Sequence, residues 1–187
     1  MVYLITALGY GGTFVVYTYL TTMLTHALGY SDQAVVGLLV VYGVMVAIGN
    51  TLGGKFTNQA PTKALSVIFL IQALVLLVVN FTTHLHFLGL LAILLMGLFA
   101  FMNVPGLQLI VVLFAERDNK ATVNFASSLN ISAFNVGITL GSVIGGYVLE
   151  QFSVMMTPFF AFIMVIVASG MMYVLYIKEK ELNLAQC

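Results

Sequence analysis

The chain is organised as long apolar runs separated by short polar segments. Each run is close to the roughly 20 residues that a helix needs to cross the hydrocarbon core of a bilayer, which is about 30 Å thick. The alternating pattern of about ten residues that is typical of a membrane-spanning barrel strand is missing. We therefore expect an all-α integral membrane protein with six transmembrane helices, followed by a solvated tail at residues 178–187. The expected spans are residues 2–24, 34–54, 64–81, 87–115, 121–149 and 158–177.

The fifth expected span carries two unusual faces. At about 100° per residue, hydroxyl and amide side chains gather on one side of the helix and small residues gather on the opposite side. The polar side requires protein or water around it rather than lipid. It consists of Asn124, Ser128, Asn135, Thr139 and Ser142.

Small residues recur at intervals of four along the opposite face of this span and allow another helix to come within backbone contact. Glycines in the second span reduce the side-chain bulk on its surface in the same way. Such a contact is either packing within the chain or an interface with a second six-helix half, and the sequence leaves both interpretations open. The predicted helix-interface or half-half contact residues are Asn130, Ala133, Asn135, Gly137, Gly141, Gly145, Gly49 and Gly53.

The first and fourth spans are interrupted and carry uncharged polar groups. Gly9, Gly11 and Gly12 predict a break, a bend or a close crossing in the first span. Pro105 removes a backbone donor and predicts a kink in the fourth span. Hydroxyl side chains recur at steps of three and four along the first span, and they either bond to neighbouring helices or contact a solute. Gln72, the isolated polar residue of the third span, is expected to bond to a neighbouring helix.

Composition supports the membrane assignment and excludes several classes of function. With 61% hydrophobic residues, 6% charged residues and a mean hydropathy of +1.11, the chain is too apolar for a soluble domain of 187 residues. No basic stripe indicates nucleic-acid binding, and no motif indicates ATP hydrolysis or a nucleophilic enzyme. His84 and His86 lack a third ligand nearby in the sequence, so no metal or other cofactor is expected. The lone Cys187 permits no internal disulfide.

The basic residues predict an orientation. With six spans, all of them fall on the same side of the membrane as the N-terminus, and the positive-inside rule then places both termini in the cytoplasm. No Asp, Glu, Lys or Arg falls well inside an expected span, so a proton-coupling residue is expected outside this chain. The basic residues are Lys55, Lys63, Arg117, Lys120, Lys178 and Lys180.

Interrupted helices at corresponding positions of two inverted three-helix repeats are typical of secondary transporters, which bind solutes near such breaks. The first and fourth spans correspond in this way. Their hydroxyl, amide, aromatic and Met side chains favour an uncharged or amphiphilic solute. The predicted solute-lining residues are Tyr3, Thr6, Tyr10, Thr13, Tyr17, Asn103 and Gln108.

Five stretches carry a family resemblance. They are YTYL (17–20), LGYSDQAVVGLLVVYG (28–43), GNTLGGK (49–55), PGLQ (105–108) and SSLNISAFNVGITLGSVIGGYV (127–148). Together they resemble the C-terminal half of a major facilitator superfamily transporter, most closely a bacterial drug:proton antiporter of the arabinose-efflux-permease type. The resemblance implies that the six spans are the family's seventh to twelfth helices. The first and fourth would line the central pathway, the second and fifth would face the other half, and the third and sixth would lie against lipid.

The resulting hypothesis is half of a transporter in the bacterial cytoplasmic membrane that exports uncharged or amphiphilic solutes or drugs by proton-coupled alternating access. Its expected partners are the lipid bilayer, an N-terminal six-helix half or a second copy of the chain, and a small-molecule solute. Asn58 and Gln59 stand where the family commonly carries an acidic-basic pair, so this loop lacks those gating charges. The alternatives are a sugar or nucleoside exporter of the same superfamily and a truncated membrane protein that does not transport.

Overall fold

The computed structural model describes residues 1–185, and these residues form helices joined by short connections, with no strand among them. The all-α prediction is therefore confirmed. The helices are α1 (Val2–Tyr17), α2 (Leu20–Thr22), η1 (Met23–Ala27), α3 (Asp32–Thr57), α4 (Pro61–Thr82), α5 (His86–Met102), α6 (Val104–Asp118), η2 (Lys120–Thr122), α7 (Val123–Gln151), η3 (Val154–Met156) and α8 (Thr157–Ala185).

Local sequence signals set several helix ends. Ser31 precedes α3, and its hydroxyl accepts a hydrogen bond from the backbone N–H of Ala34 at 3.4 Å. Pro61 lies in the first turn of α4, where its missing N–H would have no partner within the helix. Gly29 makes the turn before α3 with a φ of +74°, a conformation that residues with a Cβ rarely adopt.

Within the described residues, five helical segments are long and apolar enough to cross a membrane. They are Asp32–Thr57, Pro61–Thr82, His86–Arg117, Lys120–Gln151 and Val154–Glu181. Helix α1 is also apolar but has only 16 residues. The chain continues from it through α2 and η1 to Ala27, and these three helices occupy the place of the first expected span. The structure supports a membrane protein, while the division into six spans and two repeats stays a prediction.

The first span is interrupted at a different place from the one expected. Helix α1 runs unbroken through Gly9, Gly11 and Gly12, and the chain leaves helical geometry at Tyr19, whose φ and ψ are −109° and 21°. The glycines do not break the helix because neighbouring helices fill the space beside them. A Cβ atom on Gly11 would lie 2.8 Å from the carbonyl oxygen of Gly137 in α7. The expected close crossing is confirmed, and the expected break at the glycines is wrong.

The fourth span breaks where the sequence predicts. Helix α5 ends at Met102 and α6 begins at Val104, with Asn103 between them. Pro105 cannot donate a backbone hydrogen bond that would continue α5. Helix α6 then starts afresh, with the N–H of Leu107 donating to the carbonyl of Asn103 at 2.9 Å. The predicted interruption is therefore present at Asn103, which keeps helical φ and ψ values, while a kink in the span stays a prediction.

The last helix extends further than expected. Helix α8 runs to Ala185, so the segment predicted as a solvated tail is helical over all of its described residues. Lys and Glu residues favour this extension because they are good helix formers. Glu179 also pairs with Arg117 of α6 at 2.9 Å, which connects the extension to the rest of the bundle. Cys187 lies outside the described residues.

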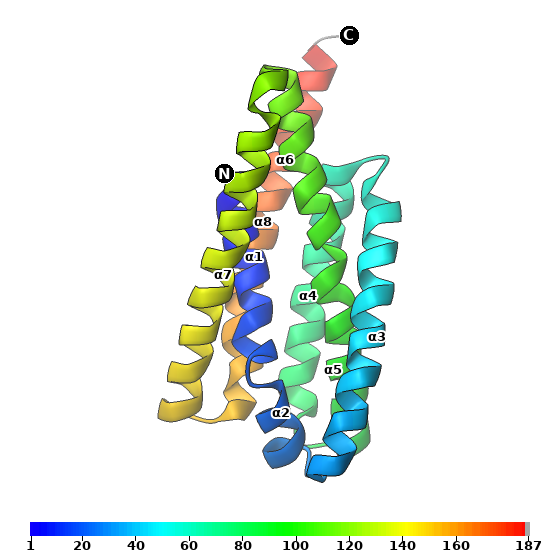
Figure 1. Ribbon diagram of the computed structural model, residues 1–187, viewed down its shortest axis with the longest axis vertical. Coiled ribbons are helices and arrows are strands. Elements are labelled where there is room, and N and C mark those ends of the chain that lie inside the picture. Colours follow the sequence, from blue (N-terminus) through cyan, green and yellow to red (C-terminus); the bar gives the residue numbers. More distant parts are fainter. Residues whose placement is uncertain (186–187) are drawn as a thin grey trace.

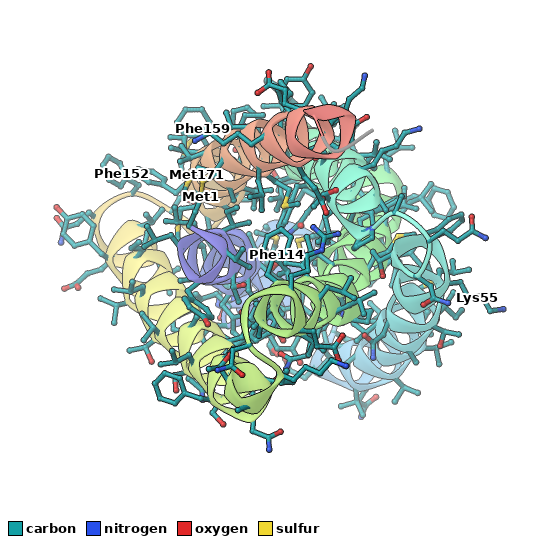
Figure 2. The ribbon with its side chains drawn as sticks, turned by 90° about the horizontal axis from the view of Figure 1, so that it is seen from above. Met1, Lys55, Phe114, Phe152, Phe159 and Met171 are labelled. Atoms are coloured by element: carbon teal, nitrogen blue, oxygen red, sulfur yellow. The ribbon has the colours of Figure 1, made fainter. Side chains whose placement is uncertain are left out.

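The helices run roughly along the long axis of the molecule, with α7 at one edge and α3 at the other (Figure 1). Viewed from above, α1 and α6 lie between these two edges, and α4 and α8 lie on the side away from α6 (Figure 2). Helix α1 packs against α7 and α8, α4 packs against α5 and α8, and α3 packs against α5. The side formed by α4 and α8 exposes apolar residues, among them Val67, Leu74, Ile163 and Val167.

Small residues bring two pairs of helices into backbone contact. Along α7, the predicted ladder faces α1, and a Cβ atom on Gly137 would lie 2.5 Å from the carbonyl oxygen of Ala7. Along α3, Gly49 and Gly53 pack in the same manner against backbone carbonyl groups of α5. The buried ladder residues of α7 are Ala133, Gly137, Gly141 and Gly145. Both contacts lie within this chain.

The Lys and Arg residues gather at one end of the bundle, which we call the cationic end. This is the end at which α3, α6 and α8 finish and α1 and α4 begin (Figure 1). The connections at the opposite end, residues 28–31, 83–85 and 152–153, contain no Lys or Arg. The charge asymmetry expected from the sequence is therefore a property of the fold.

Candidate functional site

Six aromatic rings from four helices form one continuous cluster, which we call the aromatic wall. It consists of Tyr10, Phe14 and Tyr17 of α1, Tyr42 of α3, Phe101 of α5 and Phe134 of α7. The ring centroid of Tyr10 lies 4.8 Å from that of Phe134 and 5.8 Å from that of Phe101, both edge to face. Tyr17 stacks on Tyr42 at 5.7 Å. These separations are those of favourable aromatic pairs, so the wall is an ordered surface.

The aromatic wall is accessible in part and carries no Asp, Glu, Lys or Arg. Tyr17 is 38% exposed, whereas Tyr42 is only 3% exposed. The hydroxyl of Tyr42 is buried, and it has no hydrogen-bond partner among the described residues. Leaving such a group unpaired costs about 1–3 kcal/mol, so a bound polar atom beside it would be favoured. The wall thus combines large apolar faces, partly exposed at Tyr17, with one unpaired hydroxyl that is buried in this structure.

A first polar bridge crosses the bundle between α1, α7 and α6. The hydroxyl of Thr6 donates to Oδ1 of Asn130 at 2.8 Å. The Nδ2 group of Asn130 donates in turn to Oε1 of Gln108 at 2.9 Å and to the carbonyl of Leu107 at 3.4 Å. Thr6 and Asn130 are both fully buried. This bridge fixes the position of α7 relative to the two helices beside it.

A second polar bridge connects the break of the fourth span to α4 and α1. Asn103 donates from Nδ2 to Oε1 of Gln72 at 2.9 Å, and Gln72 donates from Nε2 to the hydroxyl of Thr13 at 2.9 Å. All three residues are fully buried. The prediction that Gln72 bonds to a neighbouring helix is confirmed. Oδ1 of Asn103 has no partner among the described residues, so the break retains one unpaired acceptor.

The structure divides the predicted solute-lining residues into separate groups. Tyr10 and Tyr17 belong to the aromatic wall. The bridge residues described above point into the bundle in this conformation, because their polar atoms are bonded to other helices. Tyr3 lies apart from both groups, in a cavity of about 360 Å³ near the cationic end that Val111 and Phe125 also line. Of the predicted solute-lining residues in the two bridges, Gln108 is half-buried, and the others, Thr6, Thr13 and Asn103, are fully buried in this structure.

The two faces of the fifth predicted span separate clearly on α7. The face with Asn130 and the small-residue ladder is buried within this chain, against α1 and α6. Asn135 lies on the other face and is exposed. Ser142, on the polar side, bonds through its hydroxyl to that of Thr18 at 2.8 Å. Ser128 and Thr139 are exposed, and their hydroxyls donate to backbone carbonyls four residues earlier.

Sequence reasoning missed four members of the aromatic wall. They are Phe14, Tyr42, Phe101 and Phe134. Each lies in an apolar run, where an aromatic side chain can equally face lipid or a neighbouring helix. Tyr10, Phe14 and Tyr17 are spaced by four and three residues and so share one face of the first span; this spacing is the signal that could have identified Phe14. The other three are brought to it only by tertiary packing.

Comparisons with known proteins identify the family. Residues 2–185 match the sequence profile of the Major Facilitator Superfamily. The chain is 48% identical over 166 residues to the MFS-type transporter YtbD of Bacillus subtilis, a match that covers 89% of this chain and 42% of that protein. It is 33% identical over 147 residues to the inner membrane transport protein YdhP of Escherichia coli K12, covering 79% and 37%. It is also 28% identical over 151 residues to a protein of Helicobacter acinonychis described as "Probable sugar efflux transporter", covering 80% and 37%.

The aligned regions cover most of this chain but only part of each relative. They cover 42% of YtbD and 37% of YdhP, so the chain spans less than half the length of the curated relatives it matches. Members of the matched family are transporters and not enzymes. The helical fold, the break in the fourth span and the profile match over nearly the whole sequence agree, and the chain belongs to the major facilitator superfamily.

Proposed function

We propose that this chain is the C-terminal half of an alternating-access exporter for uncharged or amphiphilic solutes, and that the aromatic wall is its contribution to the solute pathway. The observation that carries the proposal is the wall itself, in which rings from α1, α3, α5 and α7 meet beside the break of the fourth span. Aromatic faces bind apolar and aromatic solutes, and the absence of a formal charge disfavours ions.

The exposed polar side of α7 is evidence that a second half packs against this chain. Asn135 and Thr139 are exposed on a helix that is apolar enough to cross a membrane. Polar side chains at that depth are costly in lipid and usually face protein or a water-filled path. A second six-helix unit, either the missing half of the transporter or another copy of this chain, would cover this side and close the pathway opposite the aromatic wall.

The coupling group of such an exporter would come from outside this chain. Asp32 begins α3 and Glu150 lies in the last turn of α7, both at the end opposite the cationic end. The remaining acidic residues lie near the cationic end: Glu116, Asp118, Glu179 and Glu181. None lies at the depth of the aromatic wall, so proton coupling requires an acidic residue of the second half.

The charge asymmetry of the bundle supports an orientation with the cationic end in the cytoplasm. Both termini would then be cytoplasmic. A location in the bacterial cytoplasmic membrane is supported by the relative from Escherichia coli, which is described as an inner membrane transport protein.

A sugar exporter is the second candidate. It is favoured by the Helicobacter acinonychis relative, which is described as "Probable sugar efflux transporter". A sugar ring can stack its apolar C–H face on the partly exposed Tyr17, and a movement that uncovers Tyr42 would offer its unpaired hydroxyl to the sugar. Competition separates the two candidates, because a sugar substrate would inhibit export of a sugar analogue and leave export of an apolar dye unchanged.

The main test is an efflux assay in cells that co-express this chain with an N-terminal six-helix half taken from the Bacillus subtilis relative. Nile Red, an uncharged aromatic amphiphile, serves as the probe. We expect export to require both halves. Replacing Tyr17 by Ala should slow export by about three- to tenfold, because losing one aromatic contact costs about 0.5–1.5 kcal/mol. Tyr147→Ala is the matched control, since Tyr147 is 61% exposed on α7 and lies outside the wall.

Two outcomes would overturn the proposal. The first is an equal effect of the two tyrosine variants at equal membrane levels. The second is an absence of export when both halves are inserted and shown to pair. Export by this chain without any partner would instead overturn the requirement for a second half.

A further inference from the structure

Two cavities meet at the cationic end, away from the aromatic wall. The first has a volume of about 470 Å³, and its lining of α3, α4 and α5 residues is almost entirely apolar. The second has a volume of about 670 Å³ and lies among the α3–α4 connection, α6 and α8. Gln59, Ala60 and Lys63 line both cavities. The two cavities therefore adjoin at these residues; we call the first the apolar arm and the second the polar arm.

The polar arm is cationic. Lys63, Arg117 and Lys180 line it, with Glu179 as the one acidic residue of its lining. Arg117 pairs with Glu179 at 2.9 Å. Among the side chains that the structure describes, this is the only ion pair, so neither lysine has a carboxylate partner there. The polar arm thus has an excess of positive charge and hydrogen-bond donors suited to a phosphate group.

The apolar arm has the dimensions and lining of a site for a hydrocarbon chain. Its lining extends along α4 from Lys63 to Ile71 and includes Phe99 and Met102 of α5. Val67 is 51% exposed on the outer side of α4, so the arm opens toward the surface that faces lipid. Burial of CH₂ groups in the arm gains little in a bilayer, because an acyl chain then moves from one apolar medium to another. The charged arm must therefore supply the selectivity.

We propose that this site binds one anionic phospholipid, with its phosphate held among the cations of the polar arm and one acyl chain along the apolar arm. Anionic lipids are the abundant bilayer molecules that join a negative head group to a hydrocarbon chain, and basic pockets between transmembrane helices bind such head groups. The inference requires only that the chain spans a bilayer and does not depend on its transport activity.

A bound lipid would reach the break of the fourth span. Met102, the last residue of α5, lines the apolar arm, and its backbone carbonyl is the surface on which Gly53 of α3 packs. The acyl chain would fill the space between α3 and α4 beside this point. Binding would therefore support the position of α3 relative to the break.

The test is native mass spectrometry of the purified chain in mild detergent, titrated with dioleoyl phosphatidylglycerol or dioleoyl phosphatidylcholine. The two lipids have the same acyl chains and differ in the net charge of the head group. We expect retained phosphatidylglycerol and at least tenfold weaker retention of phosphatidylcholine. Since one cation near a lipid head group changes affinity by about fivefold, K63Q/K180Q should weaken phosphatidylglycerol binding by about 30-fold. The matched control is K55Q/K120Q, which removes two cations from the same end but outside the lining of the polar arm.

A second variant probes the apolar arm. Ala64→Phe places a ring in the arm, and it should reduce phosphatidylglycerol binding without changing the charge. Equal losses in K55Q/K120Q and K63Q/K180Q would overturn the site, since any cation would then serve. Equal retention of the two lipids would also overturn it. Full displacement of phosphatidylglycerol by millimolar inorganic phosphate would show a phosphate site and would overturn the assignment to a lipid.

Discussion

Replacing Gly137 by Ala tests the close contact between α1 and α7 directly. The new Cβ atom would lie 2.5 Å from the carbonyl oxygen of Ala7 and 3.1 Å from the backbone nitrogen of Gly11. Ordinary contact begins near 3.4 Å, so the two helices must separate by 3.4 − 2.5 = 0.9 Å along that direction. Both neighbours are backbone atoms, which cannot rotate away. The hydrogen bond from Thr6 to Asn130, now 2.8 Å, crosses the same contact and would be stretched.

The size of the effect follows from two opposing terms. Overpacking of a fitted contact costs about 1–3 kcal/mol, and weakening a hydrogen bond between transmembrane helices adds about 0.6 kcal/mol. Against this, Ala is favoured over Gly in a helix by about 1 kcal/mol. Gly170→Ala provides the matched control, because nothing lies within 4 Å of a Cβ there on α8 and only the favourable term remains. We expect the two variants to differ in free energy of unfolding by about 2–4 kcal/mol, or about 30- to 700-fold in the folded-to-unfolded ratio.

The difference in free energy of unfolding can be measured in bicelles, with steric trapping as the method that monitors reversible unfolding. The order of stability should be G170A at or above the native chain, and G137A well below it. Equal stability of the two variants would refute the reasoning, because it would mean that α7 is free to move away from α1 without loss. A result in which G137A is the more stable would refute the observed contact itself.

The remaining predictions concern the polar face of α7 and the orientation of the bundle. Asn130→Ala should lower the free energy of unfolding by about 1–2 kcal/mol, because it removes several buried hydrogen bonds. In the same assay, Asn135→Ala should change the free energy of unfolding by less than about 0.5 kcal/mol, because Asn135 is exposed. Equal effects would contradict the burial of Asn130. With the native cysteine replaced by serine, Gln59→Cys at the cationic end should resist a membrane-impermeant maleimide in intact cells, while His84→Cys at the opposite end should react. The reverse labelling would overturn the proposed orientation.

Sequence patterns predicted much of the fold because lipid imposes simple rules. Each helix must satisfy its own backbone hydrogen bonds and present about 20 apolar residues, so long apolar runs identify the spans. Pro105 lacks a backbone donor, and the break beside Asn103 follows from covalent structure alone. The ladder that includes Gly137 and Gly141 likewise predicted a close contact with another helix, but it did not predict which helix would make the contact.

The candidate site was predicted less completely, for reasons that lie in the geometry of side chains. The hydroxyl stripe of the first span includes both Thr13 and Tyr17, yet Thr13 is fully buried and Tyr17 is 38% exposed. A small difference in angle around the helix decides which neighbour each side chain meets. Sequence spacing could not separate a buried hydroxyl that bridges helices from an aromatic ring that remains partly exposed.

The sequence by itself determined that this chain is helical, lies in a membrane, breaks its fourth span and carries its cations at one end, because these properties depend on composition and on neighbours along the chain. Only the tertiary structure decided that Thr6 meets Asn130, that Tyr17 stacks on Tyr42, and that Lys63 lines two adjoining cavities. Each of these features brings together residues of different helices. Their pairing depends on the order and rotation of the packed helices, which no local pattern encodes.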